Sequence, residues 1–323
     1  MAPESTSGIQ SGAQHFGFIP LPGFALLSYA TAVEPLRAAN RLAGRPLYRW
    51  TNYIVSGEET VSSSGASVRG ERLPVDRGSL HTVFVTAGGE PKDWMVRPVI
   101  ACLRRLARQG VRIGGIAGGP YLMAAAGLLA EHRFTIHWEH VEALVEAFPT
   151  LKPERSRFIL DRDRLTCGGG IAPLDMMHAL ITERLGEAFA RRVSDWFLHT
   201  HVDMPSAPQR ASLAERYGVH HAVMLAVLEK MEATLAAPLD RVTMAAFAGI
   251  SPRHLDRLFR TRLQTSYLHH YHQLRLGHAR NLLRQSALSV TEIAFACGFA
   301  SSSHFARCYR TQFGIAPSAE REA

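Results

Sequence analysis

The sequence predicts two domains of different fold class, an α/β domain followed by an all-α domain. The chain has 323 residues, more than one ordinary hydrophobic core encloses. Between residues 15 and 203, short apolar runs alternate with helical patterns of ten or more residues. After residue 218 only helical patterns occur, and two of them, 242–262 and 290–317, contain a glycine turn between two helices.

Four buried strands are expected in the first domain, with helical patterns between them. The strands are residues 15–21, 48–57, 81–88 and 111–119, and the helical patterns are 22–44, 95–110 and 120–132. This alternation forms βαβ units, so the sequence predicts a mostly parallel sheet with helices on both faces, as in the flavodoxin-like fold. We also expect a turn or hairpin at 62–70, a short strand before His137, and two closing helices at 170–185 and 187–200.

Composition also suggests where the domains begin and end. Residues 1–14 lack the basic start and apolar core of a signal peptide, so we expect a disordered leader there. The first domain is expected at 15–203. Two prolines interrupt the pattern at 204–210, which predicts a linker at 204–217. The second domain is then expected at 218–318, with a tail at 319–323.

The charge of the chain is unevenly placed. The formal net charge is +8, and residues 218–323 hold 12 Lys or Arg against 7 Asp or Glu, with a single lysine among the 12. Arginine suits phosphate and base-edge contacts better than lysine does, although a solvated basic face is the alternative. The distribution favours a nucleic-acid partner for the second domain.

Cysteine usage and hydropathy exclude several classes of protein. The four cysteines are scattered without a C-x-x-C pair, which argues against a disulfide framework or a zinc site and fits a reducing cytoplasm. No apolar run approaches 18 residues, so no membrane span is expected. The histidines His269, His270 and His272 lie within one helical turn and point in different directions, so we predict no metal there.

The loop Gly114–Pro120 is the most suggestive segment of the first domain. Its four glycines allow a sharp turn at the carboxyl end of a strand, where ligands of parallel sheets bind. Dinucleotide binding is disfavoured because the spacing is not G-x-G-x-x-G and no acidic ribose partner is evident. We therefore predict no cofactor.

Several motifs of the first domain occur in the order found in a known family. These are PGFALLSYATAVEPLRAANRLAG, TAGGE, IGGIAGGPYLMAAAGLLAE, TIHWEH and GGGIAPLDMMHALI. Residues 14–200 thus resemble the class I glutamine amidotransferase-like domain of the DJ-1/PfpI type, and more narrowly its version in GlxA-family transcription regulators. Enzymes of that superfamily carry a cysteine on the strand-to-helix turn, where Ala117 stands in this chain. The resemblance therefore implies no catalytic residue. Cys167 is the alternative thiol in a glycine loop, or simply a small buried residue.

The same resemblance implies a ligand pocket at this turn. It would be formed by Glu34, Ala117, Gly118, Gly119, Pro120, His137 and Trp138. Glu34 aligns with an acidic residue that faces the turn in the resembled family, although its position would equally suit an exposed carboxylate on a helix. For His137, the alternative to ligand binding is a structural role. A zwitterionic amine would place its cation against Glu34 and Trp138 and its carboxylate on the backbone N–H groups of the turn. Regulators of this family control arginine, glycine betaine and carnitine catabolism.

The second domain resembles the AraC/XylS-type DNA-binding domain. The segment RLGHARNLLRQSALSVTEIAFACGFASSSHFARCYRTQFGIAP carries the resemblance, together with the earlier copy RVTMAAFAGISPRHLDRLFRTRL and a joining helix. Two departures stand out: Tyr267 replaces the usual proline, and the end reads APSAERE instead of S-P-x-x-[YF]-R. Neither is expected to touch a recognition helix.

Carried over by position, two recognition helices would face the major groove of double-stranded DNA. The first offers Arg253, Asp256 and Arg257 behind the N-cap Ser251, and the second offers Ser302, Ser303, His304 and Arg307 behind Ser301. Surface salt bridging is the alternative role for Arg257 and Arg307.

Three functions remain open on the sequence alone. The first is a homodimeric transcription activator that senses a small molecule and contacts RNA polymerase. The second is a DJ-1/PfpI-type hydrolase or glyoxalase fused to a DNA-binding domain, which Ala117 disfavours. The third is a DNA-binding module with a purely structural first domain.

Overall fold

The computed structural model describes residues 12–286 and 288–322. Contacts between residues divide the chain into two compact units, Met1–Gln209 and Arg210–Ala323. The division falls inside the segment expected to be a linker. The first eleven residues of the expected leader lie outside the described residues, and Gln14 already belongs to the first strand.

The first unit contains a seven-stranded sheet in the order β5-β2-β1-β6-β7-β9-β8. The strands are β1 (Gln14–Pro20), β2 (Tyr48–Ile54), β5 (Glu71–Arg72), β6 (Leu80–Ala87), β7 (Arg112–Ala117), β8 (Phe158–Asp161) and β9 (Arg164–Cys167). All neighbours pair in parallel except β8, which is antiparallel to β9. The strands β3 (Glu59–Val61) and β4 (Ser67–Arg69) form the hairpin predicted around 62–70. The predicted mostly parallel sheet is confirmed.

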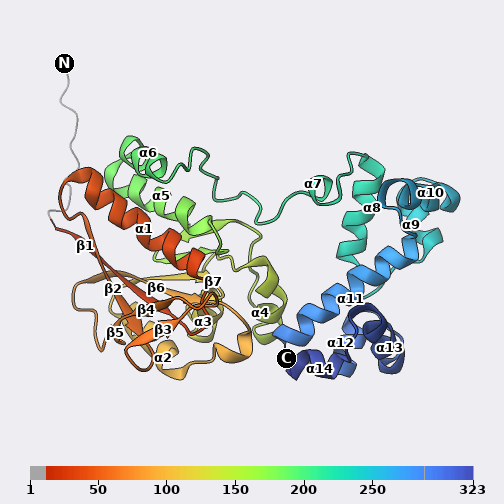
Figure 1. The fold of residues 1–323 in the computed structure, drawn as a ribbon, viewed down its shortest axis with the longest axis horizontal. Coiled ribbons are helices and arrows are strands. Elements are labelled where there is room, and N and C mark those ends of the chain that lie inside the picture. Colours follow the sequence, from red (N-terminus) through yellow and green to blue (C-terminus); the bar gives the residue numbers. More distant parts are fainter. Residues whose placement is uncertain (1–11, 287, 323) are drawn as a thin grey trace, which may run out of the picture. The chain divides into compact units, whose positions relative to one another are not determined.

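Helices cover both faces of this sheet (Figure 1). The helices α1 (Leu26–Ala43), α5 (Ala172–Leu185) and α6 (Glu187–Trp196) pack together on one face, and α2 (Arg97–Arg108) and α3 (Gly119–Ala125) cover the other. The short elements η1 (Pro91–Asp93), η2 (Trp138–His140) and α4 (Val141–Ala147) lie in the connections. The helix α1 ends where the sequence predicts, because Gly44 adopts the left-handed conformation that glycine tolerates.

Two local expectations in the first unit are wrong. The helix after the glycine loop was expected over 120–132 but ends at Ala125, because Gly127 has a φ of +71° and breaks it. The segment before His137 was expected to be a strand, yet only an isolated bridge forms there, between Thr135 and Glu154.

The second unit is all helical, as predicted. Its helices are α7 (Leu213–Tyr217), α8 (Ala222–Ala233), α9 (Arg241–Phe247), α10 (Pro252–Leu263), α11 (Tyr267–Gln285), α12 (Val290–Ala296), α13 (Ser302–Phe313) and α14 (Pro317–Glu322). One apolar core joins α8, α9 and α10 to the start of α11, and another joins the rest of α11 to α12 and α13. The long helix α11 therefore connects two similar helix-turn-helix units (Figure 1). Among the described helices of both units, none combines the length and apolar character needed to span a membrane.

Both departures from the resembled family contact a recognition helix, so that expectation is wrong. The Tyr309 hydroxyl of α13 donates a 3.0 Å hydrogen bond to Glu320, whose helix α14 occupies most of the expected tail. The Tyr267 ring packs edge-on against Phe259 of α10, with 5.4 Å between ring centroids. Sequence spacing alone did not show that α11 and α14 fold back onto these helices.

Candidate effector and DNA-binding sites

The turn after β7 keeps an unusual backbone geometry. Ala117 has a φ of +56°, a left-handed conformation that costs a non-glycine residue about 1–2 kcal/mol. It ends a strand that lies between β6 and β9, so the turn sits at the carboxyl ends of central parallel strands. The position has the strained geometry of a nucleophile turn, with a methyl group in place of a reactive atom.

The glycines of this turn make room for protein atoms. A Cβ added to Gly118 would lie 2.4 Å from the Trp94 ring, and one added to Gly119 would lie 2.1 Å from the Val85 carbonyl oxygen. The N–H of Gly118 already donates to the Ala87 carbonyl at 3.0 Å. Gly118, Gly119 and Pro120 are all buried. The backbone to which a ligand carboxylate was expected to bind is therefore buried.

A serine of α1 contacts the glycines at 168–170, which in turn pack against Ala117. Ser28 is 1% exposed, and its hydroxyl accepts a 2.8 Å hydrogen bond from the Gly170 N–H. Glu34 lies six residues further along α1, about 9 Å along the helix axis. Its carboxylate pairs with Arg37 at 2.6 Å and stays 43% exposed. Glu34 thus has the exposed helix position that the sequence left open as the alternative to a contact with the turn.

The structure does bring His137 and Trp138 to the turn. The His137 N–H donates to the Ala117 carbonyl at 3.2 Å. Burial, and then the nearby His140, lower the pKa of His137 to about 4 despite the opposing effect of Glu139, so the ring is neutral at pH 7. The indole of Trp138 is 39% exposed. The backbone of His137 thus contacts Ala117, and the partly exposed Trp138 follows it directly in the chain.

Exposed apolar side chains occur beside the contacts of this turn. Each follows or precedes a residue that packs there: Leu27 is next to Ser28, Met95 to Trp94, and Ile171 to Gly170. These three side chains are exposed singly, which is normal for a protein surface.

Cys167 cannot replace the missing nucleophile. Its side chain is fully buried at the end of β9, and burial raises the pKa of its thiol to about 12, although N–H groups of Gly169 and Ala117 oppose the shift. The thiolate is the reactive form of cysteine, and at pH 7 this thiol stays protonated.

One turn gathers three groups that bind metals in other proteins. The ligand atoms of His137, Glu139 and His140 lie within 4.8 Å of one another. The His137 Nδ1 already accepts a 3.4 Å hydrogen bond from the Glu139 N–H, and the buried His140 ring packs edge-on against Trp94. A metal ion would have to break the hydrogen bond between the Glu139 N–H and the His137 Nδ1, and it would have to reach the buried ring of His140.

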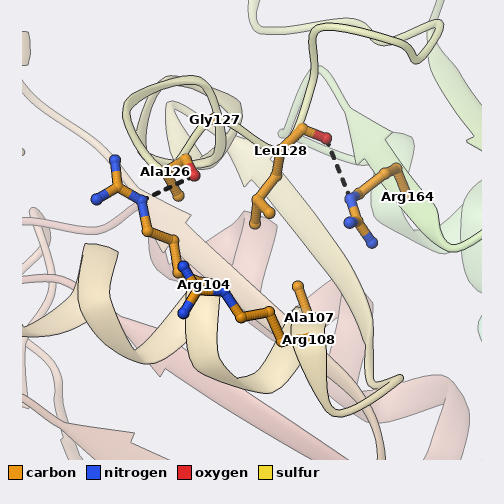
Figure 2. A pocket seen from close by; sticks show the side chains of 7 residues that line it. All are labelled: Arg104, Ala107, Arg108, Ala126, Gly127, Leu128 and Arg164. Atoms are coloured by element: carbon orange, nitrogen blue, oxygen red, sulfur yellow. Dashed lines mark hydrogen bonds between the residues drawn. The ribbon is translucent and has the colours of Figure 1, made fainter.

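A cavity of about 320 Å³ lies elsewhere in the first unit, beside the ends of α2 and α3 (Figure 2). Its lining includes Arg104, Arg108 and Arg164. The Arg104 Nε donates to the Ala126 carbonyl at 2.9 Å, and the Arg164 Nε donates to the Leu128 carbonyl at 3.1 Å (Figure 2). Arg104 therefore satisfies carbonyls at the end of α3, and Arg164 satisfies one in the loop that follows, so both have a structural role.

The first helix-turn-helix places its basic residues outward. Ser251 caps α10 by accepting from the His254 N–H at 3.2 Å, and Gly249 turns the chain with a φ of +66°. Leu255, Leu258 and Phe259 bury the inner face of α10. Arg253 and Arg257 are exposed, whereas Asp256 pairs with Arg241 of α9 at 2.8 Å.

The second helix-turn-helix repeats this arrangement. Ser301 caps α13 by accepting from the His304 N–H at 3.2 Å, after a turn in which Gly298 has a φ of +72°. Phe305 and Tyr309 bury the inner face. Ser303, His304 and Arg307 are exposed and Ser302 is half-buried, so the structure brings all four predicted residues to the N-terminal part of α13.

A buried arginine that the sequence analysis missed ties the second turn to α11. Arg275 is 7% exposed, donates to the Cys297 carbonyl at 2.6 Å and lies 4.2 Å from the Phe299 ring centre. An arginine inside the apolar stripe of a long helix was the available signal.

Comparisons with known proteins agree with both units. Residues 27–183 match the DJ-1/PfpI family and residues 244–323 match a helix-turn-helix domain. The HTH-type transcriptional regulator GlxA of Rhizobium meliloti is 55% identical over 98% of this chain and 98% of its own. The chain belongs to the GlxA family of transcriptional regulators. It is a regulator and not an enzyme.

Other relatives extend this family. The HTH-type transcriptional regulator CdhR of Pseudomonas aeruginosa is 39% identical over 96% of this chain and 92% of its own. A crystal structure of an AraC family transcriptional regulator from Pseudomonas putida has a TM-score of 0.53, with 25% identity over 57% of this chain and 99% of that chain. A ThiJ/PfpI family protein from Pseudomonas syringae shares the fold, with a TM-score of 0.51 and 19% identity over 77% of this chain and 96% of that chain. This member of the GlxA family thus joins a DJ-1/PfpI domain to an AraC-type DNA-binding domain.

Proposed function

We propose that this regulator responds to a small amine or zwitterion, of arginine-, betaine- or carnitine-like chemistry, bound beside Ala117. The observation that carries the proposal is the turn itself, which keeps the left-handed backbone of a nucleophile turn but presents a methyl group. A site that retains a strained geometry without its reactive atom is suited to binding.

The side chains beside this turn favour a cationic group. Trp138 is 39% exposed, and a cation over an indole ring gains about 0.5–2 kcal/mol. Because His137 is neutral at pH 7, its ring does not repel a cationic group. Because Glu34 is paired with Arg37, the proposal assigns the cation to Trp138 and gives Glu34 no direct contact.

On the DNA side, α10 and α13 are proposed to enter successive major grooves about 34 Å apart. Arg253 and Arg257 of α10, and Ser303, His304 and Arg307 of α13, are exposed and available for base or phosphate contacts. Asp256 is assigned to holding α9 against α10 through Arg241. The caps Ser251 and Ser301 leave helix N-termini that suit phosphate.

We further propose that the protein acts as a cytoplasmic homodimer and activates transcription through RNA polymerase. These statements follow the family resemblance. Ligand binding must favour one arrangement of the protein over another by differential affinity, since otherwise no switching occurs.

The hydrolase or glyoxalase alternative has no nucleophile to use. Ala117 carries none, and the Cys167 thiol is buried and protonated. Turnover of methylglyoxal that Cys167→Ala abolishes would revive it. A purely structural first domain predicts no stabilisation by any small molecule.

The experiment that tests the proposal is a thermal-shift screen of glycine betaine, L-carnitine, L-arginine and related amines. At least one is expected to raise the Tm of the wild-type protein, because a ligand that binds only the folded state stabilises it. Trp138→Ala should reduce that shift, and Glu34→Gln should leave it unchanged. A shift that responds to Glu34→Gln and ignores Trp138→Ala would contradict this assignment.

A further inference from the structure

Three consecutive glycines after β9 contact three different parts of the first unit. The Gly170 N–H donates to Ser28 of α1, and the Gly170 carbonyl accepts from Thr31 at 3.0 Å. A Cβ on Gly169 would lie 2.7 Å from the Ala117 Cβ. A Cβ on Gly168 would lie 2.6 Å from the amide carbon of Gln209. The Gly168–Gly170 loop therefore touches α1, the turn and Gln209 at once.

Both polar atoms of the Gln209 side chain form hydrogen bonds within the first unit. Its Nε2 carries two hydrogens and lies within hydrogen-bond distance of three acceptors, which are the Thr135 hydroxyl at 2.9 Å, the Ile136 carbonyl at 2.9 Å and the Ser156 carbonyl at 2.7 Å. Its Oε1 accepts from the Trp138 N–H at 2.8 Å. The amide thus fixes the backbone beside the proposed effector contact.

The position of Gln209 in the chain gives these contacts their significance. It is the last residue of the first unit, and Arg210 begins the DNA-binding unit. The preceding residues lie along the edge of the sheet: Pro208 bridges to Ser156, and the Pro205 carbonyl accepts from the Arg157 N–H at 3.0 Å. Any shift of Gln209 therefore moves the residue to which Arg210, the first residue of the second unit, is bonded.

We infer that the Gly168–Gly170 loop and Gln209 form a mechanical link that transmits movement at the Ala117 turn to the start of the DNA-binding unit. The inference rests on the proposed function only for its trigger, a ligand beside the turn. A ligand that displaces the loop presses Gly168 against the Gln209 amide. That amide can leave only by breaking the two hydrogen bonds that its NH2 group can donate and the one that its Oε1 accepts, so the link responds as a two-state element.

The chain allows a test that needs no ligand. In Gly168→Ala, the new methyl group displaces Gln209 from its contacts, whereas Gln209→Glu has the same size but presents an acceptor to the oxygens of Thr135, Ile136 and Ser156. Both variants of the full-length protein should be cut by trypsin after the exposed Arg210 roughly tenfold faster than wild type, because cleavage follows the population of the open form. Gly277→Ala, whose methyl group meets no atom within 4 Å, is the control and should be cut like wild type.

The double variant decides whether the two positions act together. In Gly168→Ala with Gln209→Ala, the shortened side chain leaves space for the methyl group, so cleavage should equal that of Gln209→Ala alone. Additive effects, or wild-type cleavage in both single variants, would overturn the inference.

A second measurement separates the link from general loosening. The probes are glycine betaine, L-carnitine and L-arginine, and the DNA is a sequence selected from a random pool by the wild-type protein. Gln209→Glu keeps an acceptor for the Trp138 N–H. A probe that raises the Tm and changes DNA affinity in the wild type should therefore still raise the Tm of Gln209→Glu but no longer change its DNA affinity. Retained control of DNA affinity in Gln209→Glu would also overturn the inference. If no probe raises the wild-type Tm, the proposed function fails. Trypsin cleavage of the single and double variants still tests the link in that case.

Discussion

At the scale of single residues, Ala117 and Cys167 separate this regulator from the enzymes that share its fold. Ala117 keeps the left-handed backbone at a φ of +56° without a nucleophile. Cys167 keeps a thiol but lies fully buried beneath the glycine loop. One position therefore has the required backbone geometry and the other has the required chemical group, and neither combines the two.

This separation predicts the order in which the thiols react. Under native conditions, iodoacetamide should modify the half-buried Cys308 and spare Cys167, because burial raises the pKa of the Cys167 thiol to about 12. Peptide mass spectrometry after timed labelling measures the order, and labelling in urea is the control that exposes every thiol. Native modification of Cys167 before Cys308 would contradict the assignment.

The residues of the two sites differ in how far sequence could predict them. Outward placement of Arg257 and Arg307 follows from helical periodicity, since the apolar stripe fixes which face is buried. The contact at the Ala117 turn depends on where α1 crosses another segment, which periodicity does not specify. The resemblance therefore pointed to the carboxylate of Glu34, whereas the side chain of α1 that binds the Gly170 N–H is Ser28.

At the scale of elements, the helices α10 and α13 carry exposed arginines in two similar helix-turn-helix units. Arg257→Ala and Arg307→Ala are each expected to weaken binding to a selected DNA site by about 1–3 kcal/mol, because each removes an exposed guanidinium that we propose contacts the major groove. Fluorescence anisotropy at fixed salt measures the loss. Arg45→Ala, which removes an equal charge from the first unit, is the control. Wild-type affinity in both variants would rule out this assignment of the recognition helices.

The helix α14 clamps α13 onto α11 through one carboxylate. Glu320 is 3% exposed, accepts from Arg280 at 3.0 Å and from Arg284 at 2.7 Å on α11, and accepts from Tyr309 on α13. Where the resembled family has an aromatic residue, this chain buries a carboxylate with two arginines and a tyrosine. Buried charges of this kind persist only when they are paired and hydrogen-bonded.

This cluster predicts a pH-dependent contribution to stability. Burial raises the pKa of Glu320, but hydrogen bonds from Arg280, Tyr309 and Arg284 outweigh it, so the folded-state pKa lies below the usual value. The contribution is therefore present above the unfolded pKa of about 4.3 and is lost as the pH falls through the folded pKa. Glu320→Gln should unfold about 1–3 kcal/mol more easily at pH 7 and lack this acid dependence.

Chemical denaturation followed by circular dichroism between pH 7 and pH 3 measures both effects. Glu229→Gln, on the exposed side of α8, is the charge-matched control and should behave as wild type. An unchanged free energy of unfolding in Glu320→Gln would show that the clamp contributes nothing.

At the scale of the whole molecule, each unit encloses its own apolar cores. The division at Gln209 leaves the sheet and its helices on one side and the helical cores around α11 on the other. Length and the change from alternating to purely helical patterns were enough to predict two domains. The anchoring of the linker was not predictable, because Gln209 contacts residues more than fifty positions away, such as Ser156 at 2.7 Å.

Separate cores predict that the full-length protein unfolds in two thermal transitions. Leu36 and Leu255 are both fully buried, one in each unit. Leu36→Ala and Leu255→Ala should each destabilise only their own unit by about 2–5 kcal/mol, the usual loss when a buried leucine is truncated. Differential scanning calorimetry should then show one transition moving in Leu36→Ala and the other in Leu255→Ala. A probe that binds beside Ala117 should raise only the transition that Leu36→Ala lowers, and a selected DNA should raise only the other. A single transition that both variants lower equally would mean that the units unfold together.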